Sequence, residues 1–133
     1  MKYFLDTNIC IYFLKASFPV LLDHMKKKSP EDIIIASIVK AELLLGAQKS
    51  NNPIKTGKII NEFLLPFKIL PFDDTASIIY AKIRGNLEKK GQLIGPNDLI
   101  LAATVFANNG ILVSNNEKEF RRIKGLKVEN WIK

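Results

Sequence analysis

The residues that decide the fold are Tyr3-Phe4-Leu5-Asp6-Thr7-Asn8, where three apolar side chains run directly into three polar ones. A second apolar run begins at Ile9, so the pattern predicts a short buried strand that ends at a carboxylate and is followed at once by a helix. Ligands of open parallel α/β sheets bind beyond the carboxyl ends of the strands. Asp6 is therefore placed either to serve a site or to cap the helix, and both interpretations stay open at this point.

The length of the chain, 133 residues, predicts one domain over residues 1–133, with room for a buried core. Apolar residues make up 47% and charged residues 25%, as in ordinary soluble globular proteins, and no apolar run approaches the roughly 18 residues of a membrane span. The chain reaches Asp6 after three apolar residues, so no signal peptide is expected. Cys10 is the only cysteine, which predicts a buried thiol and a cytoplasmic protein.

The charge balance is basic, with 20 Lys and Arg residues against 13 Asp and Glu, a net charge of +7 and a pI of about 9.5. This balance favours a polyanionic partner, with nucleic acid ahead of an anionic membrane surface, and no membrane association is expected. The candidates for contact with a nucleic-acid backbone are Lys118, Arg121, Arg122 and Lys124. Each of them is also compatible with an ordinary solvated helix face.

Predicted strands alternate with predicted helices along the rest of the chain. Apolar and β-branched runs predict strands at 2–5, 32–36, 68–72, 111–114 and 126–131. Helices are predicted at 8–15, 19–28, 38–49, 54–65, 73–90 and 97–109, with a short basic helix at 115–124. Pro71 places the third strand at or near a sheet edge. The alternation predicts an α/β fold, a three-layer α/β/α sandwich around a mainly parallel central sheet.

Three further acidic residues occupy positions that are unusual for surface acids. Glu42 falls on the apolar face of its predicted helix, which Ser37 is expected to cap. Asp98 opens a helix of almost purely apolar residues, and Glu119 follows the fourth strand. Each has an ordinary alternative, namely an ion pair of Glu42 with Lys49 and helix-start acids for the other two.

Together with Asp6, these acids follow different strands or head different helices, whose ends converge at one edge of a doubly wound sheet. Four carboxylates there repel one another unless a cation neutralises them, and oxygen ligands without a Cys or His cluster indicate Mg²⁺ or Mn²⁺. The single histidine, His24, is expected at the surface, which argues against a zinc site and a histidine base. A basic protein with an acidic metal pocket suits hydrolysis of phosphodiester bonds.

Four segments that lie far apart in the chain carry a family resemblance. They are Leu5–Asn8, Ser37–Leu43, Ile94–Asp98 with Ala102-Ala103, and Val113–Phe120. In this order and spacing the segments resemble PIN-domain ribonucleases, specifically the VapC toxins of bacterial toxin–antitoxin pairs, over essentially the whole chain. The resemblance implies a PIN-like sandwich and an Mg²⁺- or Mn²⁺-dependent endoribonuclease acting on RNA, with tRNA and especially initiator tRNA as the substrate. It also implies a homodimer and a VapB-type antitoxin, which fills the active-site groove and binds operator DNA.

The resemblance also implies roles for single residues. Asp6, Glu42 and Asp98 match the family's metal-binding acids. Thr7 and Asn8 match its supporting polar residues.

The fourth acidic position departs from one common version of the family, in which an aspartate stands at the place of Asn116. Here the next acid is Glu119, so the pocket is completed either by Glu119 or by a water that Asn116 supports.

A second class of function remains open from the sequence, a nucleic-acid-binding α/β module without catalysis. The acids would then be helix caps and ion pairs, and added metal would change neither RNA integrity nor thermal stability. Phosphatase, phosphoacceptor and dinucleotide-binding domains rank lower. They need, respectively, a second Asp two residues after the first, a phosphoacceptor on a middle strand and a glycine-rich first turn.

Overall fold

The computed structural model describes all 133 residues and contains one five-stranded sheet with the order β3-β2-β1-β4-β5. The strands are β1 (Tyr3–Leu5), β2 (Ile33–Ala36), β3 (Lys68–Leu70), β4 (Ile111–Val113) and β5 (Lys127–Glu129). Each neighbouring pair is parallel, so the prediction of a mainly parallel sheet is confirmed. Strand β3 lies at an edge, as Pro71 predicted.

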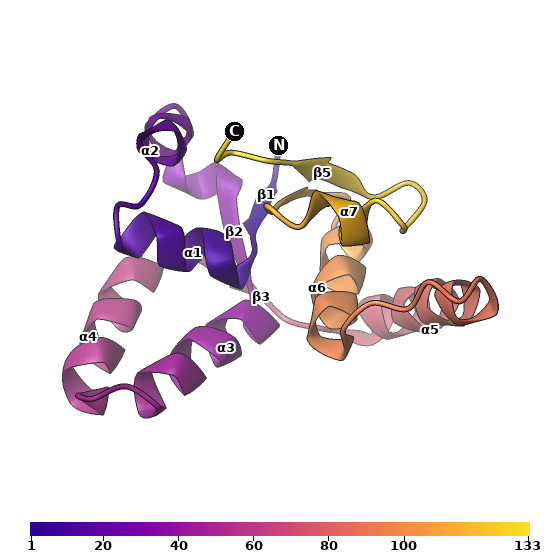
Figure 1. The fold of residues 1–133 in the computed structure, drawn as a ribbon, viewed down its shortest axis with the longest axis horizontal. Helices are drawn as coiled ribbons and strands as arrows, with labels where there is room; N and C mark the ends of the chain where they lie inside the picture. The colour runs from indigo at the N-terminus through magenta and orange to yellow at the C-terminus, as the bar shows by residue number, and fades with distance from the viewer.

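Helices cover both faces of the sheet, with α1 to α4 gathered on one side and α5 to α7 on the other (Figure 1). The first group is α1 (Thr7–Leu14), α2 (Pro19–Lys26), α3 (Ser37–Gln48) and α4 (Pro53–Leu64), with a 3₁₀ turn at Pro30–Asp32. The second group is α5 (Asp74–Lys89), α6 (Pro96–Ala107) and α7 (Glu117–Phe120). Right-handed crossovers that run in opposite directions along a sheet pack on opposite faces, which produces the predicted three-layer sandwich.

The central strands are short and apolar because helices cover both of their faces. Phe4, Leu5 and the whole of β2 are buried in one core, together with the apolar sides of α1, α3 and α6. Gly110 precedes β4 at a point where a Cβ atom would lie 2.5 Å from the Phe4 ring. Glycine at this position therefore lets β4 begin close to Lys2 and Phe4 and pair with β1. No helix combines the length and the apolar character that crossing a bilayer requires.

Two predictions about helix ends are wrong. The basic helix predicted over 115–124 is a single turn, Glu117–Phe120. Residues 121–125 form turns and a bend instead, in which Ile123 is buried in the core beside Phe120 and Gly125 has a φ of 85°. Ser37 is the first residue of α3 rather than its cap, since Ala36 occupies the cap position without a side-chain hydrogen bond.

The predicted surface position of His24 is correct only in part. His24 is half-buried, and its ring stacks on that of Trp131 with centroids 5.3 Å apart and planes inclined by 6°. A flat apolar indole offers a histidine ring a surface to cover, and no local pattern in the sequence reveals that these two residues meet.

Candidate functional site

The neighbouring strands β1 and β4 carry the centre of the site. Their connections leave in opposite directions, and open α/β sheets bind ligands at such a point, beyond the carboxyl ends of the strands. Asp6 follows β1 and Ser114 follows β4. The Asp6 backbone N–H donates to the Val113 carbonyl at 3.1 Å, so the sheet itself fixes both residues at this edge.

Asp6 is the cap of α1 and is 8% exposed. Its Oδ1 accepts a 2.8 Å hydrogen bond from the Ile9 backbone N–H, and Ser114 lies beside it because Leu5 and Val113 are paired in the sheet. Burial raises the pKa of Asp6, the Ser114 side chain and the Ile9 N–H oppose that rise, and the charge of Glu42 adds to it. Capping and a place in the acidic site are therefore combined in one residue.

Asp98 lies in the first turn of α6 and faces the other acids. Burial, together with repulsion from Glu42, Asp6 and Glu119, raises its pKa to about 6. All four predicted acids are thus within electrostatic reach, although they come from four separate parts of the chain. None of them takes part in a salt bridge, so their negative charge is not offset by the protein's own cations.

Glu42 is half-buried on α3 and accepts two hydrogen bonds from neutral donors. Thr7 Oγ1 donates to its Oε1 at 2.6 Å, and Asn97 Nδ2 donates to its Oε2 at 3.4 Å. The alternative ion pair with Lys49 is wrong, because Lys49 is exposed at the end of α3 and forms no salt bridge. Asn97 was not among the site residues predicted from the sequence, although it directly precedes Asp98.

Glu119 lies on α7 and accepts a 3.1 Å hydrogen bond from Asn116 Nδ2. The Asn116 backbone N–H donates in turn to Ser114 Oγ at 2.9 Å. Since Ser114 also lies beside Asp6, two uncharged residues stand between the acid after β1 and the acid on α7. The prediction omitted Ser114, whose only signal was its position directly after a buried strand, the position that Asp6 holds after β1.

The remaining predicted residues lie outside this hydrogen-bonded group. Asn8 is exposed in the first turn of α1, and its side chain makes no hydrogen bond to the protein. Lys118 is exposed, and Arg121 is paired with Glu117 at 3.0 Å.

A small basic hollow of about 160 Å³ lies between α5 and the turn that follows α7. Arg122 and Lys124 line it together with Lys82 and Asn86. Arg122 Nη1 donates to the Leu93 carbonyl at 3.3 Å, and none of the three cations is in a salt bridge. The hollow therefore offers uncompensated positive charge, partly from Arg122 and Lys124, which follow Glu119 closely in the chain.

The donor set of the site fits a hard divalent cation by its chemistry. The groups that meet at this edge are carboxylates, hydroxyls and amides, and no histidine is among them. No group of three or more carboxylate, imidazole or thiol side chains is arranged to hold a metal ion by itself. Mg²⁺ typically keeps several water ligands and binds only one or two protein carboxylates. An open arrangement of acids is compatible with this mode of coordination.

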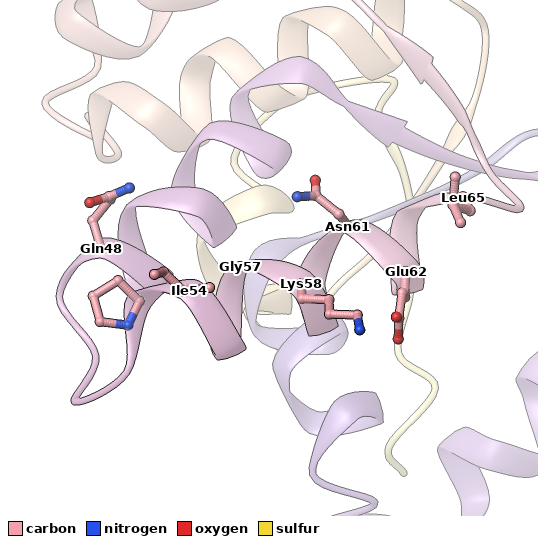
Figure 2. A pocket seen from close by; sticks show the side chains of 8 residues that line it. Gln48, Ile54, Gly57, Lys58, Asn61, Glu62 and Leu65 are labelled. Atoms are coloured by element: carbon pink, nitrogen blue, oxygen red, sulfur yellow. The ribbon is translucent and has the colours of Figure 1, made fainter.

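Two larger hollows lie beside or away from the acids. A groove of about 490 Å³ between α1, α3 and α4 has Glu42 at its rim and is otherwise mainly apolar. A hollow of about 620 Å³ lies along α4, where Ile54, Lys58 and Leu65 are among the lining residues (Figure 2). Glu62 is the only acid that lines this second hollow. The four clustered carboxylates and the 620 Å³ hollow are therefore at different places on the molecule.

Comparison with known proteins identifies the family. The model of the PIN-domain family matches residues 3–126. Ribonuclease VapC2 of Rickettsia felis is 39% identical over 134 residues that cover 100% of both chains, and the tRNA(fMet)-specific endonuclease VapC of Salmonella typhimurium is 32% identical over 98% of both. The crystal structure of R. felis VapBC2 bound to a promoter DNA fragment is similar with a TM-score of 0.92 and 38% identity, covering 98% of this chain and 99% of the other. The chain therefore belongs to the PIN-domain family, among the VapC ribonucleases.

Proposed function

We propose that this protein is an Mg²⁺- or Mn²⁺-dependent endoribonuclease toxin that hydrolyses phosphodiester bonds in RNA. The observation that carries the proposal is the gathering of Asp98, Glu42, Asp6 and Glu119 at one edge of the sheet, where burial and the charges of the other three acids raise the pKa of Asp98 to about 6. Concentrated carboxylate charge of this kind attracts a divalent cation. The named activity of its relatives, ribonuclease, supports the same conclusion.

The proposed roles follow from the contacts of each side chain. Asp6, Glu42 and Asp98 would hold the metal, and Glu119 would complete the pocket or position a water. A divalent ion bound there lowers the pKa of a water ligand and stabilises negative charge on a phosphate. Burial raises the pKa of the Cys10 thiol, so no thiolate nucleophile is available beside Asp6.

RNA contact is proposed for the basic hollow and for the cations around it. Arg122, Lys124 and Lys82 surround that hollow without salt bridges, which suits a phosphate of a single-stranded segment. Lys118 on α7 is exposed and free to add a further contact. Arg121 is the weakest of the four candidates, because its pairing with Glu117 already occupies the guanidinium.

The proposed substrate is tRNA, with initiator tRNA first, and the proposed place of action is the cytoplasm. The name of the Salmonella relative, a tRNA(fMet)-specific endonuclease, supports this choice. The test incubates the purified protein with total tRNA, with and without Mg²⁺ or Mn²⁺, and maps the ends of the fragments. Intact tRNA under every metal condition would contradict the proposal and favour the RNA-binding module without catalysis.

We further propose that a VapB-type antitoxin docks in the apolar groove and that operator DNA is bound through the antitoxin. The groove between α1, α3 and α4 supports this, because it is continuous with the acids at Glu42. The R. felis relative forms a VapBC2 complex that binds promoter DNA, which also supports it. A homodimer is the other assembly we propose, and the molar mass of the purified protein in solution tests it.

The groove can be tested with Ile59→Asp. Ile59 lines the groove and is 44% exposed, so a carboxylate there is tolerated by the fold but opposes an apolar partner. We expect the affinity for the antitoxin to fall roughly 100-fold, the loss typical of a central apolar anchor, with RNA cleavage unchanged. Ile54→Asp, on the same helix but outside the groove, is the matched control. Inhibition of Ile59→Asp at wild-type antitoxin concentrations would rule out this groove.

The support that Thr7 gives to Glu42 can be tested with Thr7→Val and Thr7→Ser. Valine keeps the shape of threonine but removes the 2.6 Å hydrogen bond to the carboxylate, whereas serine retains a hydroxyl. A hydrogen bond to a charged group is worth about 1.5–3 kcal/mol, so we expect Thr7→Val to cleave RNA at least about 10-fold more slowly. Thr7→Ser should stay close to wild type. Equal rates for the two variants would show that the hydroxyl does not orient Glu42.

A further inference from the structure

The segment Glu129–Lys133 is anchored to the core by the buried Trp131, although Glu129 and Lys133 themselves are exposed. Trp131 is 1% exposed, and its ring lies 5.3 Å from the rings of both Tyr3 and His24. Its Nε1 donates to the carboxylate of Glu129 at 2.9 Å. Because the segment is held in this way, it can fix the position of the residues to which it is hydrogen-bonded.

Asn130 is the residue through which this segment reaches the loop after β4. Its Oδ1 accepts a 3.0 Å hydrogen bond from the Ile132 backbone N–H. Its Nδ2 donates to Asn115 Oδ1 at 3.0 Å and to Glu117 Oε2 at 3.1 Å. Because the amide oxygen already faces a backbone donor, the orientation of the amide is determined, and only its NH₂ group faces the loop.

Glu117 gathers the other contacts of the loop. Its carboxylate pairs with Lys133 Nζ at 2.7 Å and with Arg121 Nη2 at 3.0 Å, besides the bond from Asn130. These three hydrogen bonds, with Lys133 first, lower the pKa of Glu117 to about 2. Exposed ion pairs add little to stability, so the main effect of this group is to fix the position of the loop.

The residues of the loop 114–117 contact two different parts of the protein, namely the segment Glu129–Lys133 and the acids of the site. Asn115 and Glu117 are bonded to the anchored segment. Ser114 lies beside Asp6, because the two directly follow the paired residues Val113 and Leu5, and Asn116 donates to Glu119 at 3.1 Å. The Ser114 backbone N–H also donates to the Glu129 carbonyl at 3.0 Å, so the loop is held to the segment at both of its ends.

We propose that Asn130 and Glu117 are positioning residues of the metal site: they clamp the loop 114–117 so that Ser114 and Asn116 present two of the acids in metal-binding geometry. This inference rests on the proposed function, because it assigns the clamp to the proposed metal site. Neither residue touches metal or substrate, and the clamp acts only through the loop. Loosening it should therefore weaken metal binding more than it slows cleavage at saturating metal.

The test is Asn130→Asp, which sets a second carboxylate against Glu117 where the amide donated before. We expect the Kd for Mn²⁺, measured by titration without RNA, to rise about 10-fold, the lower end of the range for loss of an outer-shell partner. The Mn²⁺ concentration for half-maximal cleavage should rise by the same factor, with kcat at saturating Mn²⁺ nearly unchanged. Glu88→Gln, which removes the carboxylate of the exposed Arg84–Glu88 pair on α5, is the matched control and should alter neither value.

A double variant separates the clamp from simple destabilisation. Glu117→Gln combined with Asn130→Asp exchanges donor and acceptor, and we expect it to recover most of the Mn²⁺ affinity. An unchanged Mn²⁺ Kd in folded Asn130→Asp would overturn the clamp, and so would a loss that the double variant does not recover. Failure of the proposed function is distinct, since the wild-type protein itself would then neither bind Mn²⁺ nor cleave RNA.

Discussion

Replacing Asp98 by asparagine is expected to abolish RNA cleavage and to raise the melting temperature of the metal-free protein. Loss of a metal-binding carboxylate removes several kcal/mol of stabilisation of the transferring phosphate, so cleavage should fall about 1,000-fold or more. The amide keeps the size of the side chain at the start of α6. The two effects are therefore predicted to run in opposite directions, one on activity and one on stability.

The gain in stability follows from the sign of the pKa shift. The pKa of Asp98 is about 6 in the folded protein, against 3.8 for an unperturbed aspartate. Between these two values the folded state holds a proton that the unfolded state has lost, so the free energy of unfolding falls as pH rises. Above pH 6 the ionised Asp98 is repelled by Glu42, Asp6 and Glu119, and an uncharged asparagine removes that repulsion.

Two further variants complete this test. Asp6→Asn should also abolish cleavage while leaving the fold intact, because asparagine caps helices as well as aspartate does. Asp74→Asn is the matched control, since Asp74 is likewise an acid in the first turn of a helix but lies on α5, outside the acidic site. Cleavage rates and thermal melts of the three proteins provide the measurement. Wild-type rates in both Asp6→Asn and Asp98→Asn would sink the proposed mechanism.

Withdrawal of divalent metal is the second large effect. EDTA is expected to reduce cleavage to background, and added Mn²⁺ or Mg²⁺ to restore it, because the acids alone supply no activated water. Binding requires the ionised form of Asp98, so protons compete with the metal below the pKa of about 6. The apparent Mn²⁺ affinity should fall about 10-fold for each pH unit below that value and level off above it.

Mn²⁺ titrations across this pH range, monitored by thermal melting, measure the competition directly. Bound metal should raise the melting temperature of the wild-type protein, and the rise should shrink as pH falls through 6. Asp98→Asn should show no such rise at any pH. A pH-independent Mn²⁺ affinity would mean that Asp98 is not a ligand, even if cleavage still required metal.

Much of the fold can be predicted from local patterns, because the length and spacing of an apolar run indicate which of its residues are buried. The run Ile33–Ala36 reads as a strand covered on both faces, and all four residues are buried. Gly91 directly follows the predicted helix 73–90 and has a φ of 64°, a conformation that glycine adopts without strain and that is common where helices end. Pro71 marked an edge strand for an equally local reason, the missing N–H donor.

The acids of the site were also predictable, but their partners were not. Asp6 after β1 and Asp98 at the start of α6 stand out from local context alone. The bond from Thr7 to Glu42 joins residues 35 positions apart, and no periodicity reveals it. The same holds for Ser114, whose contact with Asp6 exists because β1 and β4 are neighbours in the sheet.

The sequence by itself therefore determined which segments are buried, in which order strands and helices follow, and which acids sit at strand ends or helix starts. Only the tertiary structure decided that Glu42 is held by Thr7 rather than Lys49, and that His24 stacks on Trp131. It alone also showed that Asn130 reaches the loop before Glu119. The physical reason is that burial is encoded by nearby residues, whereas the pairing of polar groups depends on strand order and crossovers that bring distant residues together.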